Sequence, residues 1–231
     1  MLGDLVRAPG ARERAKAERR LRLKEAALAV FGEKGYEGAT TREIAERAGV
    51  GAATLFRYAA EKRDLLLMIV NDDLAAINAT AFAELDIDAP LVDGLIVLFA
   101  PRYTYFGANP PLAREATHLT VLARAEDDTF ETQRYRHRRD QLLTTMTNLI
   151  RYQQGRGFVR GDCDPAFLAD FFLDIYIAQR RRWLSEAKPD VARGIADLRH
   201  MLELAIDGAR ATSARSTNRL GRRRVERAAS P

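Results

Sequence analysis

The chain has 231 residues and a mass of 25.9 kDa, enough for one large domain or two smaller ones. Hydrophobic residues make up 47% of it, which excludes a largely disordered protein. A single cysteine, Cys163, excludes an internal disulfide and a multi-cysteine metal site, and we expect neither a metal nor a cofactor. The longest apolar runs, such as residues 95–100, are too short to cross a bilayer. We therefore expect a cytoplasmic protein with no membrane partner.

Charge is distributed unevenly along the chain. The net charge is +5, but residues 1–65 carry +4, residues 66–209 carry −5 and residues 210–231 carry +6. A basic head and a basic tail around an acidic body suggest that the two ends meet a polyanion. Many solvated tails are basic and bind nothing, so whether either end contacts DNA stays open.

Helical periodicity is found nearly everywhere in the chain, and no convincing strand pattern interrupts it. We therefore predict an all-α protein. Residues 1–10 are expected to be a flexible N-terminus. A first helix should run from about Ala11 to Glu33, with Gly35 just past its end in a left-handed cap. Thr40 and Glu43 then have the spacing of a capping box, which predicts the start of a second helix.

Two short helices follow each other closely in this region. Gly49 closes the first of them, the second spans about Ala52 to Tyr58, and a longer helix begins near Lys62. Two short helices joined by a tight turn outline a helix-turn-helix, which places its second helix in the major groove of DNA. We therefore assign residues 11–62 to a three-helix DNA-binding domain.

The remaining chain reads as a larger bundle of longer helices over residues 63–210. We expect breaks near residues 85–90, 107–111, 125–128, 155–164 and 188–189. Asp164 followed by Pro165 is typical of an N-cap with proline at the first helical position. The last helix should span about residues 190–209. We expect residues 211–231, rich in Ser, Thr and Arg, to form a disordered basic tail.

One stretch of the first domain resembles the DNA-binding domain of the TetR family of bacterial transcriptional regulators. The matching residues, between Leu23 and Leu65, are Ala26-Ala27-Leu28, Phe31, Gly35-Tyr36, Thr40 to Ala45, Ala48-Gly49-Val50, Thr54 to Tyr58 and Lys62 to Leu65. A second, shorter stretch is similar to the start of the family's penultimate long helix. It consists of Gly157-Phe158-Val159 and Asp164-Pro165. Elsewhere the resemblance is limited to length and helical layout.

The resemblance implies roles for individual residues. Thr40 would cap the second helix and touch phosphate, Arg42 would reach the groove, and Lys62 would contact phosphate. The predicted DNA-binding residues are Thr40, Thr41, Arg42, Ala52, Ala53, Thr54, Phe56, Arg57, Tyr58 and Lys62.

Two features of this set depart from the family pattern or limit base recognition. Phe56 stands where a tyrosine hydroxyl usually binds phosphate, so that hydrogen bond is lost. Ala52 and Ala53 can touch thymine methyl groups, but their side chains cannot hydrogen-bond base edges. Sequence readout should then depend on Arg42, Thr54, Arg57 and Tyr58, together with DNA shape.

The resemblance also implies that the larger domain binds a small-molecule effector and forms a homodimer through its last two long helices, suited to palindromic operator DNA. Candidate effector-binding residues are Tyr103, Phe106, His118, Phe130, Phe172 and Tyr176. An aromatic residue at helical spacing is more often part of the core, and His118 is the candidate polar anchor. The arginine runs 134–139 and 180–182 should mostly face solvent. An inward-pointing arginine would favour an acidic or acyl-type effector.

We predict a repressor that an effector releases from operator DNA, each weakening the binding of the other. One alternative is a dimeric helical DNA-binding protein without an effector, architectural or constitutively repressing. A helical enzyme or a small-molecule-binding protein is a further alternative. Gly155, Gly157 and Gly161 miss the dinucleotide-binding spacing, and the sequence has no phosphate-binding loop or hydrolase motif. We therefore expect no enzyme.

Overall fold

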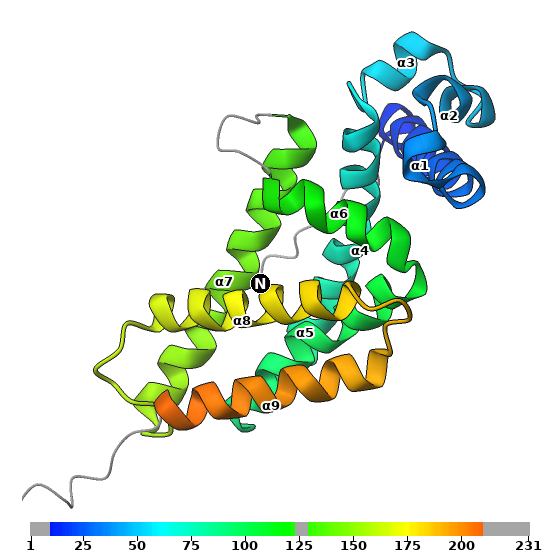
Figure 1. The fold of residues 1–231 in the computed structure, drawn as a ribbon. Helices are drawn as coiled ribbons and strands as arrows, with labels where there is room; N and C mark the ends of the chain where they lie inside the picture. The colour runs from blue at the N-terminus through cyan, green and yellow to red at the C-terminus, as the bar shows by residue number, and fades with distance from the viewer. Residues whose placement is uncertain (1–9, 123–128, 210–231) are drawn as a thin grey trace, which may run out of the picture.

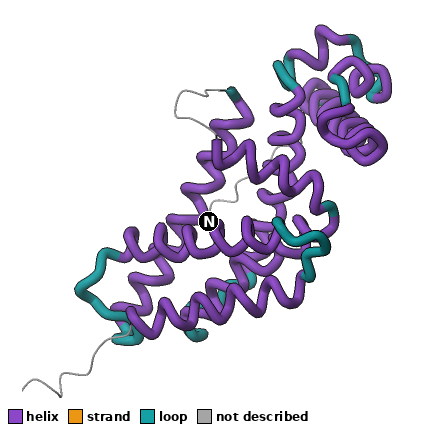
Figure 2. Tube along the Cα trace, in the orientation of Figure 1, coloured by secondary structure: helices purple, strands orange, loops and turns teal. Residues whose placement is uncertain are grey.

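The computed structural model describes residues 10–122 and 129–209. The predictions for residues 1–10, for a break near 125–128 and for a tail over 211–231 fall largely or wholly outside these ranges. Within the described ranges the chain forms α-helices joined by loops, with no strand, which confirms the predicted all-α class (Figure 2).

Four helices form the N-terminal part of the fold: α1 (Ala11–Gly38), α2 (Thr41–Arg47), α3 (Ala52–Phe56) and α4 (Lys62–Ala83). The stripe of α1 that includes Leu23, Ala27 and Phe31 is buried against the other helices. Gly35 interrupts α1 with φ 72° and ψ 168°, a conformation open to glycine, and one more turn continues to Gly38. The regular part of the first helix therefore ends just before Gly35, as predicted, and a further turn to Gly38 follows the break.

The predicted capping box at the start of α2 is present. The Thr40 hydroxyl accepts a hydrogen bond from the Glu43 amide at 3.3 Å, and the Glu43 carboxylate accepts one from the Thr40 amide at 3.2 Å. The following helix, α3, ends at Phe56 and is shorter than the predicted span to Tyr58. The two short helices thus begin where the sequence predicts.

The fourth helix, α4, connects the first three helices to the rest of the molecule. By length and composition α4 could also cross a membrane, although its longest unbroken apolar run covers only residues 65–70. However, 56% of its apolar window is buried inside the protein. Core helices pass the same test, so this burial fits a central packing helix.

Five helices complete the described fold: α5 (Leu91–Ala108), α6 (Pro110–Leu122), α7 (Phe130–Gly155), α8 (Pro165–Leu184) and α9 (Val191–Ala209). Asp164 caps α8 by accepting a hydrogen bond from the Ala166 amide at 3.1 Å, as predicted. Figure 1 shows α8 and α9 side by side, at the end of the molecule opposite α2 and α3. α6 packs against both α1 and α4, between the two ends.

A close contact between α5, α8 and α9 fixes the far end of the bundle. A Cβ atom at Gly194 would lie 2.8 Å from the Trp183 side chain and 2.9 Å from that of Tyr103, so only glycine allows this approach. The Trp183 indole donates a hydrogen bond to the carbonyl of Asp190 at 2.7 Å. This packing fills the space beside the candidate effector residues of α5 and α8.

Candidate nucleic-acid interface and internal cavity

The turn between α2 and α3 holds the two helices in a fixed relation. Gly49 has φ 64°, and the Val50 amide donates to the Ala45 carbonyl at 3.0 Å. Ile44 on α2 and Leu55 on α3 are both buried in the core of this unit. Because the inner faces are anchored in this way, the opposite faces of both helices are presented to solvent.

Several predicted DNA-binding residues lie on that outer face. The Arg42 side chain is 87% exposed and pairs with Glu46 at 3.0 Å. An exposed pair of this kind contributes little, so Arg42 remains available for another partner. Ala52, Ala53 and Phe56 are exposed as well.

Four other predicted residues, Thr54, Arg57, Tyr58 and Lys62, have partners within the protein. The Tyr58 hydroxyl donates to the Lys16 carbonyl of α1 at 3.3 Å. The Lys62 ammonium donates to the Glu37 carbonyl at 3.1 Å and lies 4.5 Å from the centre of the Tyr36 ring. Arg57 and Thr54 are within 3.5 Å of each other. The structure thus collects the predicted residues on α2, α3 and the start of α4, with Tyr58 and Lys62 also bracing α1.

The predicted effector-binding residues separate into three groups. Phe106 and Tyr176 line an internal cavity. Tyr103 and Phe172 are fully buried, and Tyr103 packs on Trp183 with 4.8 Å between ring centres, so both belong to the core.

His118 and Phe130 lie elsewhere. His118 is exposed on α6 and does not line the cavity, so the structure contradicts its predicted place as the polar anchor; its neighbour Thr117 lines the cavity instead. Phe130 is exposed at the start of α7 and borders an open groove of about 830 Å³ against α1. The prediction for His118 was wrong because α6 directs this side chain toward solvent.

The internal cavity lies among α4, α5, α6, α7 and α8 and measures about 70 Å³. Its apolar lining includes Leu74, Leu142 and Leu173. Its polar lining consists of Arg102, Arg138, Arg139, Arg180, Thr117, Thr120, Tyr135 and Tyr176. Such a mixture of apolar walls and a few polar groups is typical of a small-molecule site, although this volume is well below the roughly 300–1,000 Å³ of drug-sized pockets.

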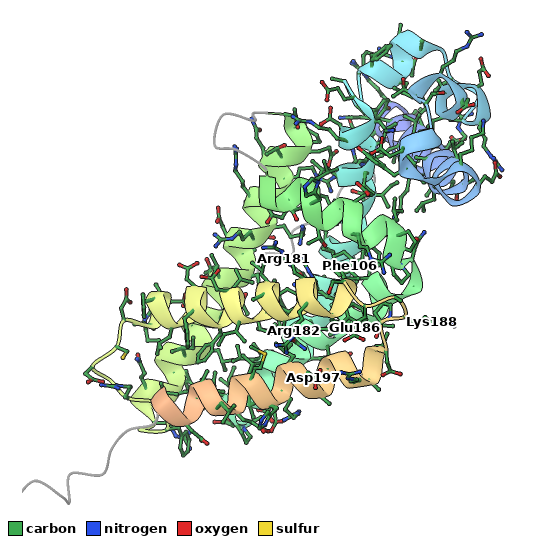
Figure 3. The ribbon with its side chains drawn as sticks, in the orientation of Figure 1. Phe106, Arg181, Arg182, Glu186, Lys188 and Asp197 are labelled. Atoms are coloured by element: carbon green, nitrogen blue, oxygen red, sulfur yellow. The ribbon has the colours of Figure 1, made fainter. Side chains whose placement is uncertain are left out.

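Three of these arginines, two buried and one half-buried, converge from three helices. Arg102 on α5 is 2% exposed and Arg180 on α8 is 8% exposed, while Arg138 on α7 is half-buried. In Figure 3 the next two residues of α8, Arg181 and Arg182, leave the helix on different sides, and Arg182 lies toward α9, where it reaches Met201. The run 180–182 therefore mostly faces solvent, as expected, with Arg180 as its inward member.

The environment of Arg102 and Arg138 disfavours the charged form of their guanidinium groups. Burial, and after it the neighbouring Arg102, lowers the pKa of Arg138 to about 10. Burial also lowers the pKa of Arg102, with a further contribution from Arg180. A pKa of about 10 leaves Arg138 charged at neutral pH, and guanidinium groups in proteins stay protonated in general, so the cavity is cationic.

A second group of charges, Arg20, Asp72, Glu131 and Arg134, joins α1 to α4 and α7, and we call it the junction cluster. Arg20 donates to Asp72 at 3.0 and 2.9 Å and to Glu131 at 2.9 Å. Arg134 donates to Asp72 at 2.7 Å and to Glu131 at 2.9 Å. Every member has two charged partners, and the cluster ties the N-terminal helix to the larger bundle.

Asn71 connects the junction cluster to the cavity. Its amide nitrogen donates to the Glu131 carbonyl at 2.8 Å and to the Glu131 carboxylate at 3.1 Å. Its amide oxygen accepts from Arg138 at 3.4 Å. A continuous set of hydrogen bonds therefore runs from a cavity arginine to Arg20 on α1.

Known sequences resemble the N-terminal part of the chain. Residues 23–69 match the family described as bacterial regulatory proteins, tetR family. The HTH-type transcriptional repressor KstR of Mycolicibacterium smegmatis is 40% identical over 65 residues, 28% of this chain and 32% of that protein. KstR of Mycobacterium tuberculosis is 30% identical over 111 residues, 48% of this chain and 50% of that protein. The matches thus span between a third and a half of the relatives' length.

Solved structures share the fold over most of the chain. FadR of Thermus thermophilus, described as a TetR family transcriptional repressor in complex with lauroyl-CoA, aligns with a TM-score of 0.64 at 22% identity over 85% of this chain and 98% of that one. FadR of Bacillus subtilis, in complex with stearoyl-CoA, aligns with a TM-score of 0.63 at 16% identity over 81% and 98%. These likenesses extend the common architecture beyond the N-terminal domain.

Proposed function

Because residues 23–69 match the family of bacterial regulatory proteins, tetR family, we propose that the protein is a TetR-family transcriptional repressor that a small-molecule effector releases from operator DNA. The observation that carries the proposal is the family match over residues 23–69, which covers the α2–α3 pair with its exposed outer face. The curated relatives named above are repressors, which supports this direction of regulation.

DNA recognition would use the outer face of α2 and α3. Arg42 has the exposure and the charge to reach a base edge or a phosphate, and Thr40 opens α2, whose N-terminal amides favour an anion. Ala52 and Ala53 at the start of α3 would allow close approach to the groove. Lys62 would contact phosphate by exchanging its intramolecular partner, the Glu37 carbonyl, for DNA.

Dimerisation through α8 and α9 is the second part of the proposal. Phe167 on α8 is 67% exposed and Leu204 on α9 is 62% exposed, and Phe171 is exposed one turn after Phe167. Large apolar side chains gathered on two adjacent helices are costly in water and favour an interface. A two-fold dimer would suit a palindromic operator with half-sites roughly 34–36 Å apart, or a multiple of that distance.

Coupling between effector and DNA is the third part. The cavity would bind the effector, and the hydrogen bonds through Arg138, Asn71 and Glu131 would carry its effect to Arg20 on α1. Since α1 packs on the helix-turn-helix, a shift of α1 would change the position of α3 in each half of a dimer. Effector and operator would then each weaken the binding of the other by the same factor.

The test is binding of the purified full chain to the DNA immediately upstream of its own gene, against random DNA at physiological salt. We expect specific, salt-dependent binding by a dimer. Arg42→Ala should weaken specific binding by about 1–3 kcal/mol with little change on random DNA. Lys62→Ala should weaken binding to both duplexes and lower the salt slope by about one.

The exposed Arg151, near the end of α7, supplies a matched control, because Arg151→Ala removes the same charge outside both the α2–α3 face and the proposed interface of α8 and α9. Its DNA affinity should equal that of the wild type. Upstream DNA bound no more tightly than random DNA would count against regulation of the neighbouring gene. An Arg42→Ala loss of the same size on both duplexes would reduce Arg42 to a phosphate contact.

A further inference from the structure

The cavity arginines, Arg102, Arg138 and Arg180, have no acidic partner among the residues that the structure describes. Over residues 10–122 and 129–209, none of the three forms an ion pair with an aspartate or glutamate, and none of the cavity-lining residues is acidic. Their hydrogen-bond partners are neutral: the side-chain oxygens of Asn78, Asn71 and Tyr176, respectively. Three positive charges therefore face one small space without compensation.

Each of these arginines also has a donor that is buried and unused. The unpartnered atoms are Nη1 of Arg102, Nε of Arg138 and Nε of Arg180. A buried charge without a counter-ion, or a buried donor without an acceptor, raises the free energy of the folded state. The fold is therefore less stable than it would be with apolar residues here, and an anion in the cavity would remove that penalty.

The position of each arginine on its helix shows that the arrangement is built into the fold. Arg102 continues the buried stripe of Leu95, Leu98 and Phe99 on α5. Arg180 follows Tyr176 by one turn on α8, and its guanidinium lies 4.8 Å from the Phe106 ring and 5.2 Å from the Tyr176 ring. These contacts hold Arg180 in place against the cavity wall.

We infer that the cavity binds the carboxylate or phosphate group of a small organic anion, with Arg102, Arg138 and Arg180 donating hydrogen bonds to its oxygens. Guanidinium groups recognise both anions through paired donors, so the two share one chemistry here. Phe106 and Leu142 would contact the apolar part of the ligand. The volume of about 70 Å³ fits a compact anionic group in this conformation.

The regulatory meaning of this site rests on the proposed function, but binding itself is measured without DNA. The purified full chain is titrated with sodium phosphate, sodium butyrate and neutral butyramide at constant ionic strength, by calorimetry and by thermal unfolding. We expect saturable binding and a raised melting temperature with phosphate or butyrate. Butyramide has the shape of butyrate without its charge and should do neither.

Variants locate the site. Arg180→Met, and the double variant Arg102→Met with Asn78→Leu, should each weaken anion binding by about tenfold or more, because each removes charged hydrogen bonds. Arg181→Met, at the exposed neighbour of Arg180, should leave the affinity unchanged. The double variant also removes the polar partner of Arg102, so it should remain folded if Arg180→Met does not.

Two results would overturn the inference: no saturable binding of either anion, or equal binding by the wild type and the double variant. DNA binding separates this outcome from the larger proposal. Anion binding that leaves operator affinity unchanged would keep the site and remove its role as effector site. Release of operator by butyramide, without anion binding, would keep the regulator and remove the anion site.

Discussion

The junction cluster and the cavity both contain arginines and lie next to each other in the molecule. The arginines of the two groups differ in the charge of their partners. Arg20 and Arg134 are each paired with both Asp72 and Glu131. Within the described part of the chain, Arg102, Arg138 and Arg180 have only neutral partners. Asn71 lies between them, bound to Glu131 on one side and to Arg138 on the other.

The difference shows that the effect of a buried guanidinium on stability depends on its partner. Where carboxylates form ion pairs with the arginine, removing one partner leaves an uncompensated charge and destabilises the fold. Where no carboxylate is present, the charge opposes folding and remains available to a ligand. Substitutions in the two groups should therefore change stability in opposite directions.

The largest effect is expected from Glu131→Gln in the junction cluster. Glu131 is 1% exposed and its carboxylate accepts hydrogen bonds from Arg20, Arg134 and Asn71. Glutamine keeps the size but removes the charge, so the free energy of unfolding should fall by about 3 kcal/mol. Urea denaturation measures the change.

Glu46→Gln is the matched control for that experiment. Glu46 also pairs with an arginine, Arg42, but both side chains are mostly exposed. Its substitution should cost less than about 0.5 kcal/mol. Equal losses in the two variants would mean that burial does not strengthen the junction cluster.

A smaller, pH-dependent effect is expected from Asp72→Asn. Burial opposes ionisation of Asp72, but hydrogen bonds from Arg20 and Arg134 outweigh it and hold the pKa of this carboxyl below its ordinary value of 3.8. As pH falls, the unfolded chain takes up the proton first, so this contribution is complete above the ordinary pKa and is lost as pH falls through the folded-state pKa. The variant should lose about 2 kcal/mol of stability at neutral pH.

The difference between wild type and Asp72→Asn should shrink as pH is lowered below about 4. Denaturation curves between neutral pH and pH 3 measure it. Asp170→Asn, at an exposed carboxylate paired with Arg139, should show little change at any of these pH values. A difference for Asp72→Asn that is constant over the whole range would show that its charge does not contribute.

The local features of the fold could be predicted from the sequence because they depend on neighbouring residues. Two helix starts are each marked by a pair of residues that are close in sequence. The pairs are Thr40 with Glu43 and Asp164 with Pro165. The outer face of α2 and α3 was found in the same way, since a short motif carries it. Gly35 predicted the end of regular α1, although one further turn follows it.

The polar groups inside the larger domain were harder to predict, because residues from distant segments of the chain form both the junction cluster and the cavity. The sequence separation is 52 residues between Arg20 and Asp72 and 111 between Arg20 and Glu131, so no local pattern reveals which arginines are paired. His118 looked like the polar group of an apolar helix, but α6 turns it outward. Arg102 was overlooked, although its place in the apolar stripe of α5 was a usable signal.

If the cavity arginines serve a ligand, they should lower the stability of the protein when no ligand is bound. The most direct measurement is the free energy of unfolding, without added anion, of the double variant Arg102→Met with Asn78→Leu. This variant replaces a buried charge and its amide partner by apolar side chains, so stability should rise by about 1 kcal/mol or more. Arg114→Met, which removes hydrogen bonds to the carbonyls of Leu184 and Glu186, should lower it. A double variant less stable than the wild type would show that Arg102 supports the fold, and would contradict the account.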